Sequence, residues 1–112
     1  MSLAGLADAV LAEPTLAALL EEASSTPGLD VTAPSALRPF LVDGLRRAGR
    51  TVLAVTPTTR DAETLTEALG SLVDPDLVAH YPSWETLPHE RLSPRSDTVG
   101  KRLAVLRRLR HP

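Results

Sequence analysis

The sequence lacks cysteine altogether and is poor in aromatic residues. Without cysteine the chain can form neither a disulfide framework nor a thiolate metal site. Aromatic residues make up 3% of the chain, too few for the stacking platform that binds single-stranded nucleic acid. Nowhere do about 18 apolar residues run together, so no transmembrane helix is expected, and the first residues lack the basic segment of a signal peptide. These absences indicate a cytoplasmic protein with no membrane partner.

The composition that remains is that of a globular domain whose charges are unevenly distributed. The 112 residues are 43% hydrophobic and 23% charged, which suits one compact domain. Residues 1–30 hold five acids and no base, whereas residues 91–112 hold seven bases against Asp97 alone. The Ala- and Arg-rich composition suggests a high-GC bacterium such as an actinobacterium. The basic end predicts an anionic partner, or a docking surface that is completed elsewhere.

Apolar residues at helical spacing predict a series of helices. Pro14 opens the second of them, and Pro39 must lie in the first turn of the third, because a proline deeper inside would cost about 3 kcal/mol. Gly49 is placed to end that helix, and Thr58 or Thr59 to cap the next. The expected helices cover residues 3–11, 14–23, 37–48, 58–72 and 99–110.

Three short apolar runs between these helices predict β-strands, at residues 29–32, 51–55 and 77–81. The run at 51–55 is continuous and partly β-branched, which is typical of a strand buried on both faces. Strands that alternate with helices through short connections form parallel sheets. The sequence therefore predicts an α/β fold with a parallel sheet and flanking helices.

The connection after the first expected strand lacks the residues of a phosphate loop. Such a loop needs glycines, a lysine for the β- and γ-phosphates, and a Ser or Thr hydroxyl for magnesium. Residues 28–39 contain no GK[ST] motif, and the only lysine of the chain is Lys101. We therefore expect no nucleotide, magnesium or other cofactor to bind this chain.

No group of residues supports catalysis or metal binding. The histidines lack metal-ligand spacing, two loop glutamates suit ion pairs or caps, and the serines lack a nucleophile elbow. We expect no catalytic residue and no metal site. The residues considered are His80, His89, His111, Glu85, Glu90, Ser83, Ser93 and Ser96.

The basic residues near the end of the chain are the candidate contacts for nucleic acid or for a partner. Two interpretations stay open: a solvated helix face whose arginine stems cover apolar neighbours, or a surface that contacts nucleic acid or an acidic protein. Contact with DNA would go to phosphates and weaken steeply with salt. The candidates are Arg91, Arg95, Lys101, Arg102, Arg107 and Arg108.

A proline-punctuated segment over residues 81–97 carries the most distinctive motif of the chain, with Trp84 and Leu87 as its expected anchors. Together with the leucine repeat of residues 102–109, it resembles the N-terminal region of the bacterial transcription-repair coupling factor family, Mfd. The resemblance covers residues 29–110. The motif positions are Pro82, Trp84, Glu85, Thr86, Leu87, Pro88, Glu90, Arg91, Ser93 and Pro94.

The resemblance implies a fold and a domain organisation. The N-terminal module of the family is similar to the repair protein UvrB, which has a RecA-like parallel sheet, but its phosphate loop is degenerate. Residues 1–28 would be an N-terminal helical segment, and residues 29–112 an incomplete UvrB-like α/β subdomain. Residues 81–97 look like a shortened counterpart of the UvrB hairpin that grips damaged DNA.

The resemblance also implies a function. The full-length family displaces stalled RNA polymerase from DNA with ATP and recruits UvrA for nucleotide-excision repair. ATP and magnesium would bind only in a downstream motor, so this piece would be a non-catalytic scaffold joined to the rest of the factor. UvrA, RNA polymerase and duplex DNA would be partners of the whole protein. The alternative is a stand-alone nucleic-acid-binding domain that uses the Arg-rich helix at the end of the chain.

Overall fold

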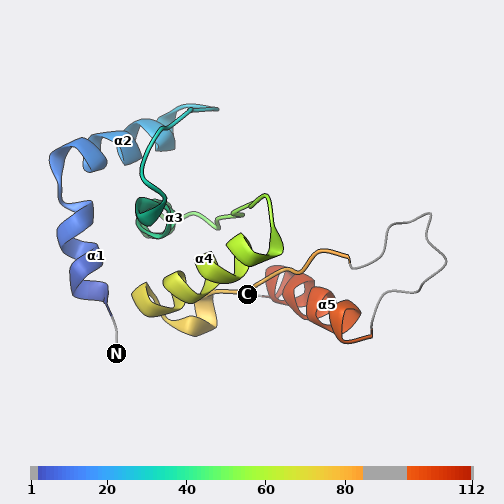
Figure 1. Cartoon of the computed structure of the whole chain (residues 1–112). Coiled ribbons are helices and arrows are strands. Elements are labelled where there is room, and N and C mark those ends of the chain that lie inside the picture. Colours follow the sequence, from blue (N-terminus) through green and yellow to red (C-terminus); the bar gives the residue numbers. More distant parts are fainter. Residues whose placement is uncertain (1–2, 85–95, 112) are drawn as a thin grey trace.

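The computed structural model describes residues 3–84 and 96–111, and within them it is built from helices, short 3-10 turns and extended connections (Figure 1). No helix in these ranges is both long and apolar enough to cross a membrane. The elements in chain order are α1 (Ala4–Leu11), α2 (Pro14–Ser25), η1 (Ser35–Leu37), α3 (Arg38–Arg47), α4 (Thr59–Leu72), η2 (Pro75–Leu77) and α5 (Ser96–Arg110).

The predicted α/β class, with its RecA-like parallel sheet, is wrong for the part of the chain that the structure describes, because that part contains no strand. Residues 29–32 and 51–55 have no regular secondary structure, and no backbone hydrogen bond joins them to each other or to residues 78–81. Leu53 and Val55, expected inside the sheet, are each 83% exposed. An apolar run becomes a strand only when neighbouring backbone completes its hydrogen-bond ladder, and no other described segment hydrogen-bonds to these residues in this way.

The helix boundaries, in contrast, follow the local signals in the sequence. Pro14 is the first residue of α2, and Pro39 lies in the first turn of α3. Thr58 caps α4 by accepting a hydrogen bond from the backbone N–H of Asp61 at 3.1 Å. Gly49 follows α3 with a φ of 92°, a left-handed conformation that favours glycine. These predictions are confirmed because each depends on neighbours within one helical turn.

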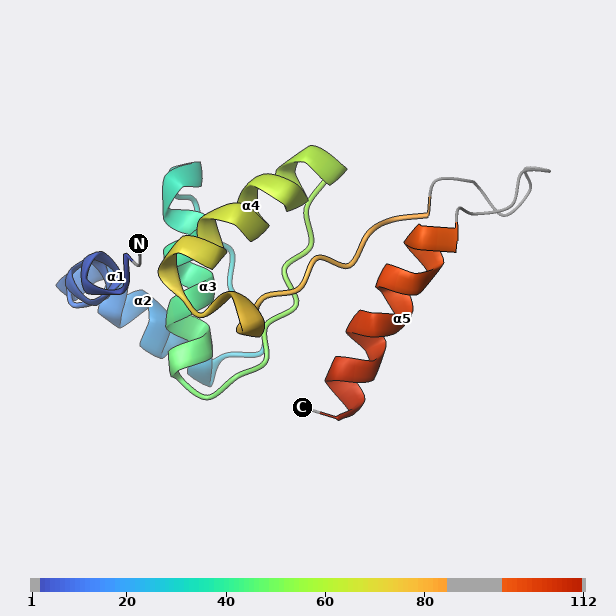
Figure 2. The same cartoon turned by 90° about the horizontal axis from the view of Figure 1, so that it is seen from below.

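The helical body consists of α1, α2 and α4 packed around α3 (Figures 1 and 2). Its small core is built from Ala7 of α1, Leu16 of α2, and Leu69 and Leu72 of α4. The backbone N–H of Leu3 donates to the carbonyl oxygen of Ser71 at 2.7 Å, which ties the start of α1 to the end of α4. Helices from before and after residue 28 pack together in this body. The division of the chain into residues 1–28 and 29–112 stays a prediction.

Helix α5 lies apart from this body. It packs against none of the other helices in the described ranges, and Figure 2 shows it to one side of α3 and α4. Its hydrogen bonds and ring contacts go instead to η2 and the connection that follows it, residues 76–84. The last helix therefore keeps much of its surface free of the core.

A candidate docking surface on the last helix

The sequence of α5 favours a helix with a basic end. Asp97 lies in its first turn, and Arg107, Arg108 and Arg110 lie in its last turn. An acid near the N-terminus and bases near the C-terminus both oppose the partial charges of the helix dipole. Four of the basic residues predicted from the sequence, Lys101, Arg102, Arg107 and Arg108, thus lie on a regular element whose charge increases toward its C-terminal end.

Arg102 is held between two aromatic rings. Its guanidinium carbon lies 4.1 Å from the ring centroid of Tyr81 and 4.1 Å from that of Trp84. Its Nη1 also donates to the carbonyl oxygen of Pro82 at 2.5 Å. Such cation–π contacts stabilise by roughly 0.5–2 kcal/mol each, depending on their exposure. Arg102 therefore fixes the first half of α5 against the preceding connection and does not present a free cation.

Arg108 makes the equivalent attachment in the second half of the helix. Its Nη2 donates to the carbonyl oxygen of Asp76, and its Nη1 lies 3.4 Å from the carbonyl oxygen of Val78. Arg102 and Arg108 are six residues apart, so the two attachments together align α5 with residues 76–84. These arginine contacts attach the helix to the connection, while its leucines, Leu103, Leu106 and Leu109, stay exposed.

The structure thus separates the residues that the sequence grouped as contacts. Arg102 and Arg108 both donate hydrogen bonds to backbone carbonyl oxygens of the chain, although Arg108 is also exposed, whereas Lys101 and Arg107 are exposed and make no such bond within the described residues. Trp84, an expected anchor of its loop, is 48% exposed and stacks on a cation instead of an apolar core. No spacing rule pairs Trp84 with Arg102, which follows it by 18 residues, so sequence reasoning missed this stack. The candidates Arg91 and Arg95 and the motif residues Glu85, Leu87 and Pro88 lie outside the described ranges.

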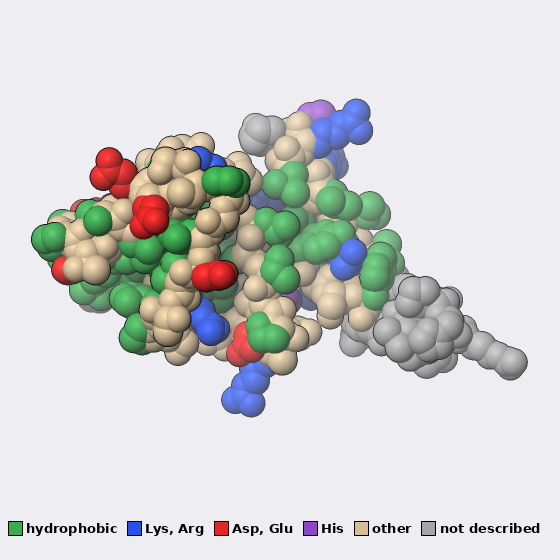
Figure 3. Space-filling view, turned by 90° about the horizontal axis from the view of Figure 1, so that it is seen from above, with side chains coloured by type: hydrophobic (Ala, Val, Ile, Leu, Met, Phe, Trp, Pro, Cys, Tyr) green, Lys and Arg blue, Asp and Glu red, His purple; other side chains and the backbone are tan. Residues whose placement is uncertain are grey.

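An exposed leucine face accompanies the free bases. Leu103 is 60% exposed and Leu106 is 48% exposed, and the two lie on neighbouring turns of one face of α5. Arg107 follows Leu103 by four residues and Arg110 follows Leu106 by four, so each leucine has a basic neighbour one turn further along. Figure 3 shows hydrophobic side chains at the surface over α5, beside the blue side chains near its C-terminal end. We call Leu103, Leu106, Arg107 and Arg110 the α5 face.

A buried acid that the sequence analysis did not single out holds the helical body together. The side chain of Asp43 on α3 is 0% exposed, and its oxygens accept hydrogen bonds from Arg46 Nε at 3.0 Å, Arg46 Nη2 at 2.8 Å and Arg47 Nε at 3.0 Å. Arg47 also pairs with Asp8 of α1, and this hydrogen bond raises the pKa of Arg47. The spacing of Asp43 from Arg46 and Arg47 was the available signal. The network is structural, since it links α1 to α3 and has no open position for a ligand.

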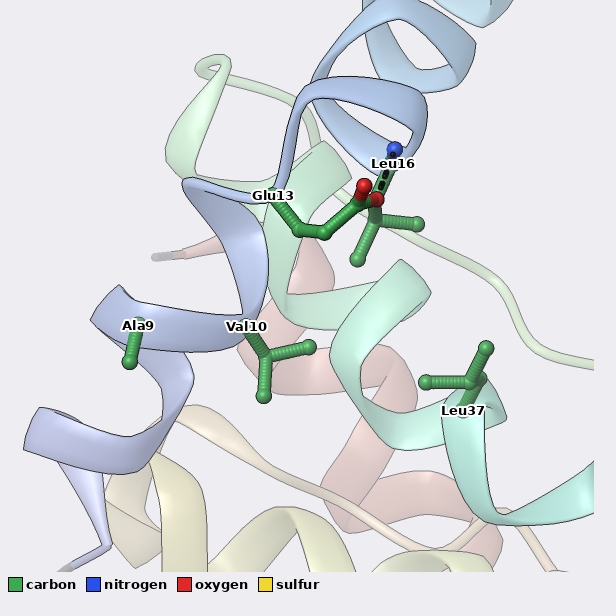
Figure 4. A pocket seen from close by; sticks show the side chains of 5 residues that line it. All are labelled: Ala9, Val10, Glu13, Leu16 and Leu37. Atoms are coloured by element: carbon green, nitrogen blue, oxygen red, sulfur yellow. Dashed lines mark hydrogen bonds between the residues drawn. The ribbon is translucent and has the colours of Figure 1, made fainter.

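The hollow between α1, α2 and η1 is almost entirely apolar and has no group of residues suited to catalysis. It has a volume of about 410 Å³ and is lined by Glu13 and four apolar residues (Figure 4). The carboxylate of Glu13 accepts a hydrogen bond from the backbone N–H of Leu16 at 2.9 Å, so it caps α2. That bond, followed by one from the N–H of Thr15, lowers the pKa of Glu13. Within residues 3–84 and 96–111 no group of three or more His, Asp or Glu side chains could hold a metal ion.

The comparison with curated proteins gives the chain its family. Transcription-repair-coupling factors of Mycobacterium tuberculosis and Mycobacterium bovis are each 47% identical to it over 111 residues, which is 98% of the chain. The chain belongs to the transcription-repair-coupling factor family. The factor of Haemophilus influenzae is 41% identical over 54 residues, 48% of the chain. The resemblance deduced from the motif is thereby confirmed.

The chain spans only a small part of these coupling factors. It covers 9% of the length of each mycobacterial relative and 5% of the Haemophilus protein. No protein-family model matches it. No solved structure matches it either.

Proposed function

We propose that this chain is a non-catalytic scaffold segment of a transcription-repair coupling factor. The observation that carries the proposal is the 47% identity to mycobacterial coupling factors over 98% of the chain. In the whole factor, ATP-driven displacement of stalled RNA polymerase from DNA and recruitment of UvrA would depend on regions outside these residues. The factor would act in the cytoplasm.

The described residues support a role without nucleotide chemistry. Where a phosphate loop would lie, residues 28–34 form an irregular connection that leads into η1 and α3. Pro34 and Pro39 lie on either side of η1, and neither has a backbone N–H that could donate to a phosphate. ATP and magnesium would therefore be bound elsewhere in the factor.

The engaged arginines argue against the alternative of a stand-alone nucleic-acid-binding domain. Phosphate contacts need cations that are free to replace counterions along a duplex. Arg102 and Arg108 point back to carbonyl oxygens of residues 76–82, and three exposed leucines, Leu103, Leu106 and Leu109, lie among the other cations of the helix. A scaffold or protein-contact role fits this arrangement better.

A chimera tests the proposal. This chain would replace the corresponding 111 residues of the Mycobacterium tuberculosis factor, in cells that lack their own coupling factor. We expect the chimera to restore the faster repair of transcribed strands after ultraviolet damage, and a factor without the region to restore it less well. A stable, normally expressed chimera that repairs both strands at one rate would refute the proposal.

A further inference from the structure

We propose that the α5 face is a docking site for an acidic amphipathic helix of a partner protein. Leu103 and Leu106 are 60% and 48% exposed although they lie within a regular helix. Neither belongs to the core of the helical body, and α5 packs against no other helix in the described ranges. Amphipathic helices dock through anchors at positions i, i+3, i+4 and i+7 of one face. Leu103 and Leu106 supply the apolar anchors at i and i+3, while Arg107 and Arg110 occupy i+4 and i+7.

The charges beside the leucines determine the chemistry of the partner. Arg107 and Arg110 lie beside the two leucines on the α5 face, both are exposed, and the face itself carries no acid. The C-terminal end of α5 adds its partial negative charge only at the last carbonyls, which these arginines already offset. A partner helix that places leucines against Leu103 and Leu106 and glutamates beside Arg107 and Arg110 would complement both features.

Other occupants fit this face less well. A nucleic acid would gain nothing from the two leucines, and Arg102 and Arg108 are not free to extend the basic surface along a phosphate backbone. A second copy of the chain would bring another basic α5 face, with its arginines, against this one, since it carries the same residues. An acidic helix meets neither obstacle.

The attachment of α5 keeps this face available. Because Arg102 and Arg108 attach the helix to residues 76–84, and Leu103 and Leu106 are exposed, these contacts do not use the two leucines. Docking would therefore bury leucine surface without first breaking a core contact. The affinity would depend on the leucines, and the choice of partner on the arginines.

Fluorescence anisotropy with a designed peptide tests the proposal. The probe is a labelled helix of about three heptads with Leu at a and d and Glu at e and g, and the control peptides carry Lys in place of Glu or the same residues in scrambled order. We expect saturable micromolar binding of the acidic peptide alone. The double variant Leu103→Gln, Leu106→Gln and the double variant Arg107→Glu, Arg110→Glu should each weaken it at least tenfold.

Matched controls separate docking from unfolding. Gln is a good helix former, so circular dichroism of the glutamine variant should stay unchanged. The glutamate variant places acids against the helix dipole at the C-terminal end of α5, so it should lose at most the signal of the last turn. Leu53→Gln alters a leucine that is 83% exposed outside α5, and this variant should bind the peptide as the parent does. The chimeric full-length factor should also bind it, which would show that the rest of the factor leaves the face open.

Five results would overturn the proposal: no binding of the acidic peptide, equal binding of the scrambled peptide, no effect of the α5 variants, competition by duplex DNA, or binding to the chain but not to the chimera. A sixth is a dimer, seen by light scattering, that the Leu103→Gln, Leu106→Gln variant abolishes. That dimer would make a second copy the occupant of the face.

Discussion

Replacing Asp43 with alanine removes the only charged side chain that is buried in the described part of the chain. The Asp43 carboxylate accepts three hydrogen bonds from Arg46 and Arg47, at 2.8–3.0 Å. Arg47 also pairs with Asp8 across the α1–α3 contact. The substitution therefore weakens the contact between the two helices as well as the local ion pairs of α3.

The loss in unfolding free energy depends on how well water can replace Asp43 as the hydrogen-bond partner of Arg46 and Arg47. A hydrogen bond to a charged group contributes about 1.5–3 kcal/mol, and breaking a fully buried ion pair costs about 3–5 kcal/mol. Arg46 and Arg47 keep 39% and 33% of their side-chain surface exposed, so water replaces part of what Asp43 supplied. We therefore expect Asp43→Ala to lower the free energy of unfolding by about 2–4 kcal/mol, or Tm by roughly 10 °C.

Urea and thermal unfolding followed by circular dichroism at 222 nm measure this effect. Asp43→Asn should lower the free energy of unfolding nearly as much as Asp43→Ala. An amide keeps the shape of the carboxylate but carries no charge, so the charge-assisted hydrogen bonds to the arginines are lost. Glu63→Ala serves as the control, since Glu63 is an exposed acid on α4, and it should change stability by less than about 0.5 kcal/mol. If Asp43→Ala behaved like Glu63→Ala, the reasoning about the buried acid would be refuted.

The remaining predictions concern helix α2, two glycines and the attachment of α5. The lowered pKa of Glu13 means that its cap is fully formed above its ordinary pKa of 4.5 and is lost as the pH falls through the lower folded value; the protection of amides at the start of α2, relative to their intrinsic exchange at the same pH, should fall there, and Glu13→Gln should remove this pH dependence. Gly70→Ala should raise stability by about 0.5–1 kcal/mol, because a Cβ there meets no atom within 4 Å, and a lower Tm would contradict this. Gly44→Ala should melt below Gly70→Ala, because its Cβ would lie 2.5 Å from a Leu20 methyl. Arg102→Ala should raise the fluorescence anisotropy decay rate of Trp84 and speed proteolysis before α5, and unchanged values would show that the stack does not hold the helix.

How much of this structure the sequence could predict depended on the range of the interactions. The ends of α2, α3 and α4 follow from Pro14, Pro39, Gly49 and Thr58, since caps and turns act between neighbouring residues. The strand at residues 51–55 was predicted from an apolar run alone. A strand also needs partners from distant segments, which a local pattern cannot supply.

In the candidate docking surface on α5, local features could also be predicted from the sequence and long-range contacts could not. The basic character of α5 and its leucine repeat could be predicted, because both are helical patterns. The stack of Arg102 between Tyr81 and Trp84 could not, because it depends on the path of the chain between residues 84 and 102. The ion pairs of Asp43 could have been predicted, since Arg46 and Arg47 lie three and four residues further along the helix. The spacing does not reveal that the acid is buried.

Calorimetric titration of ATP with magnesium into the 112-residue chain tests most directly that it is a scaffold without nucleotide chemistry. The absent phosphate-loop residues and the proline-flanked turn before α3 predict no heat of binding beyond dilution. Saturable binding in the micromolar range would contradict the account and would place nucleotide chemistry within these residues.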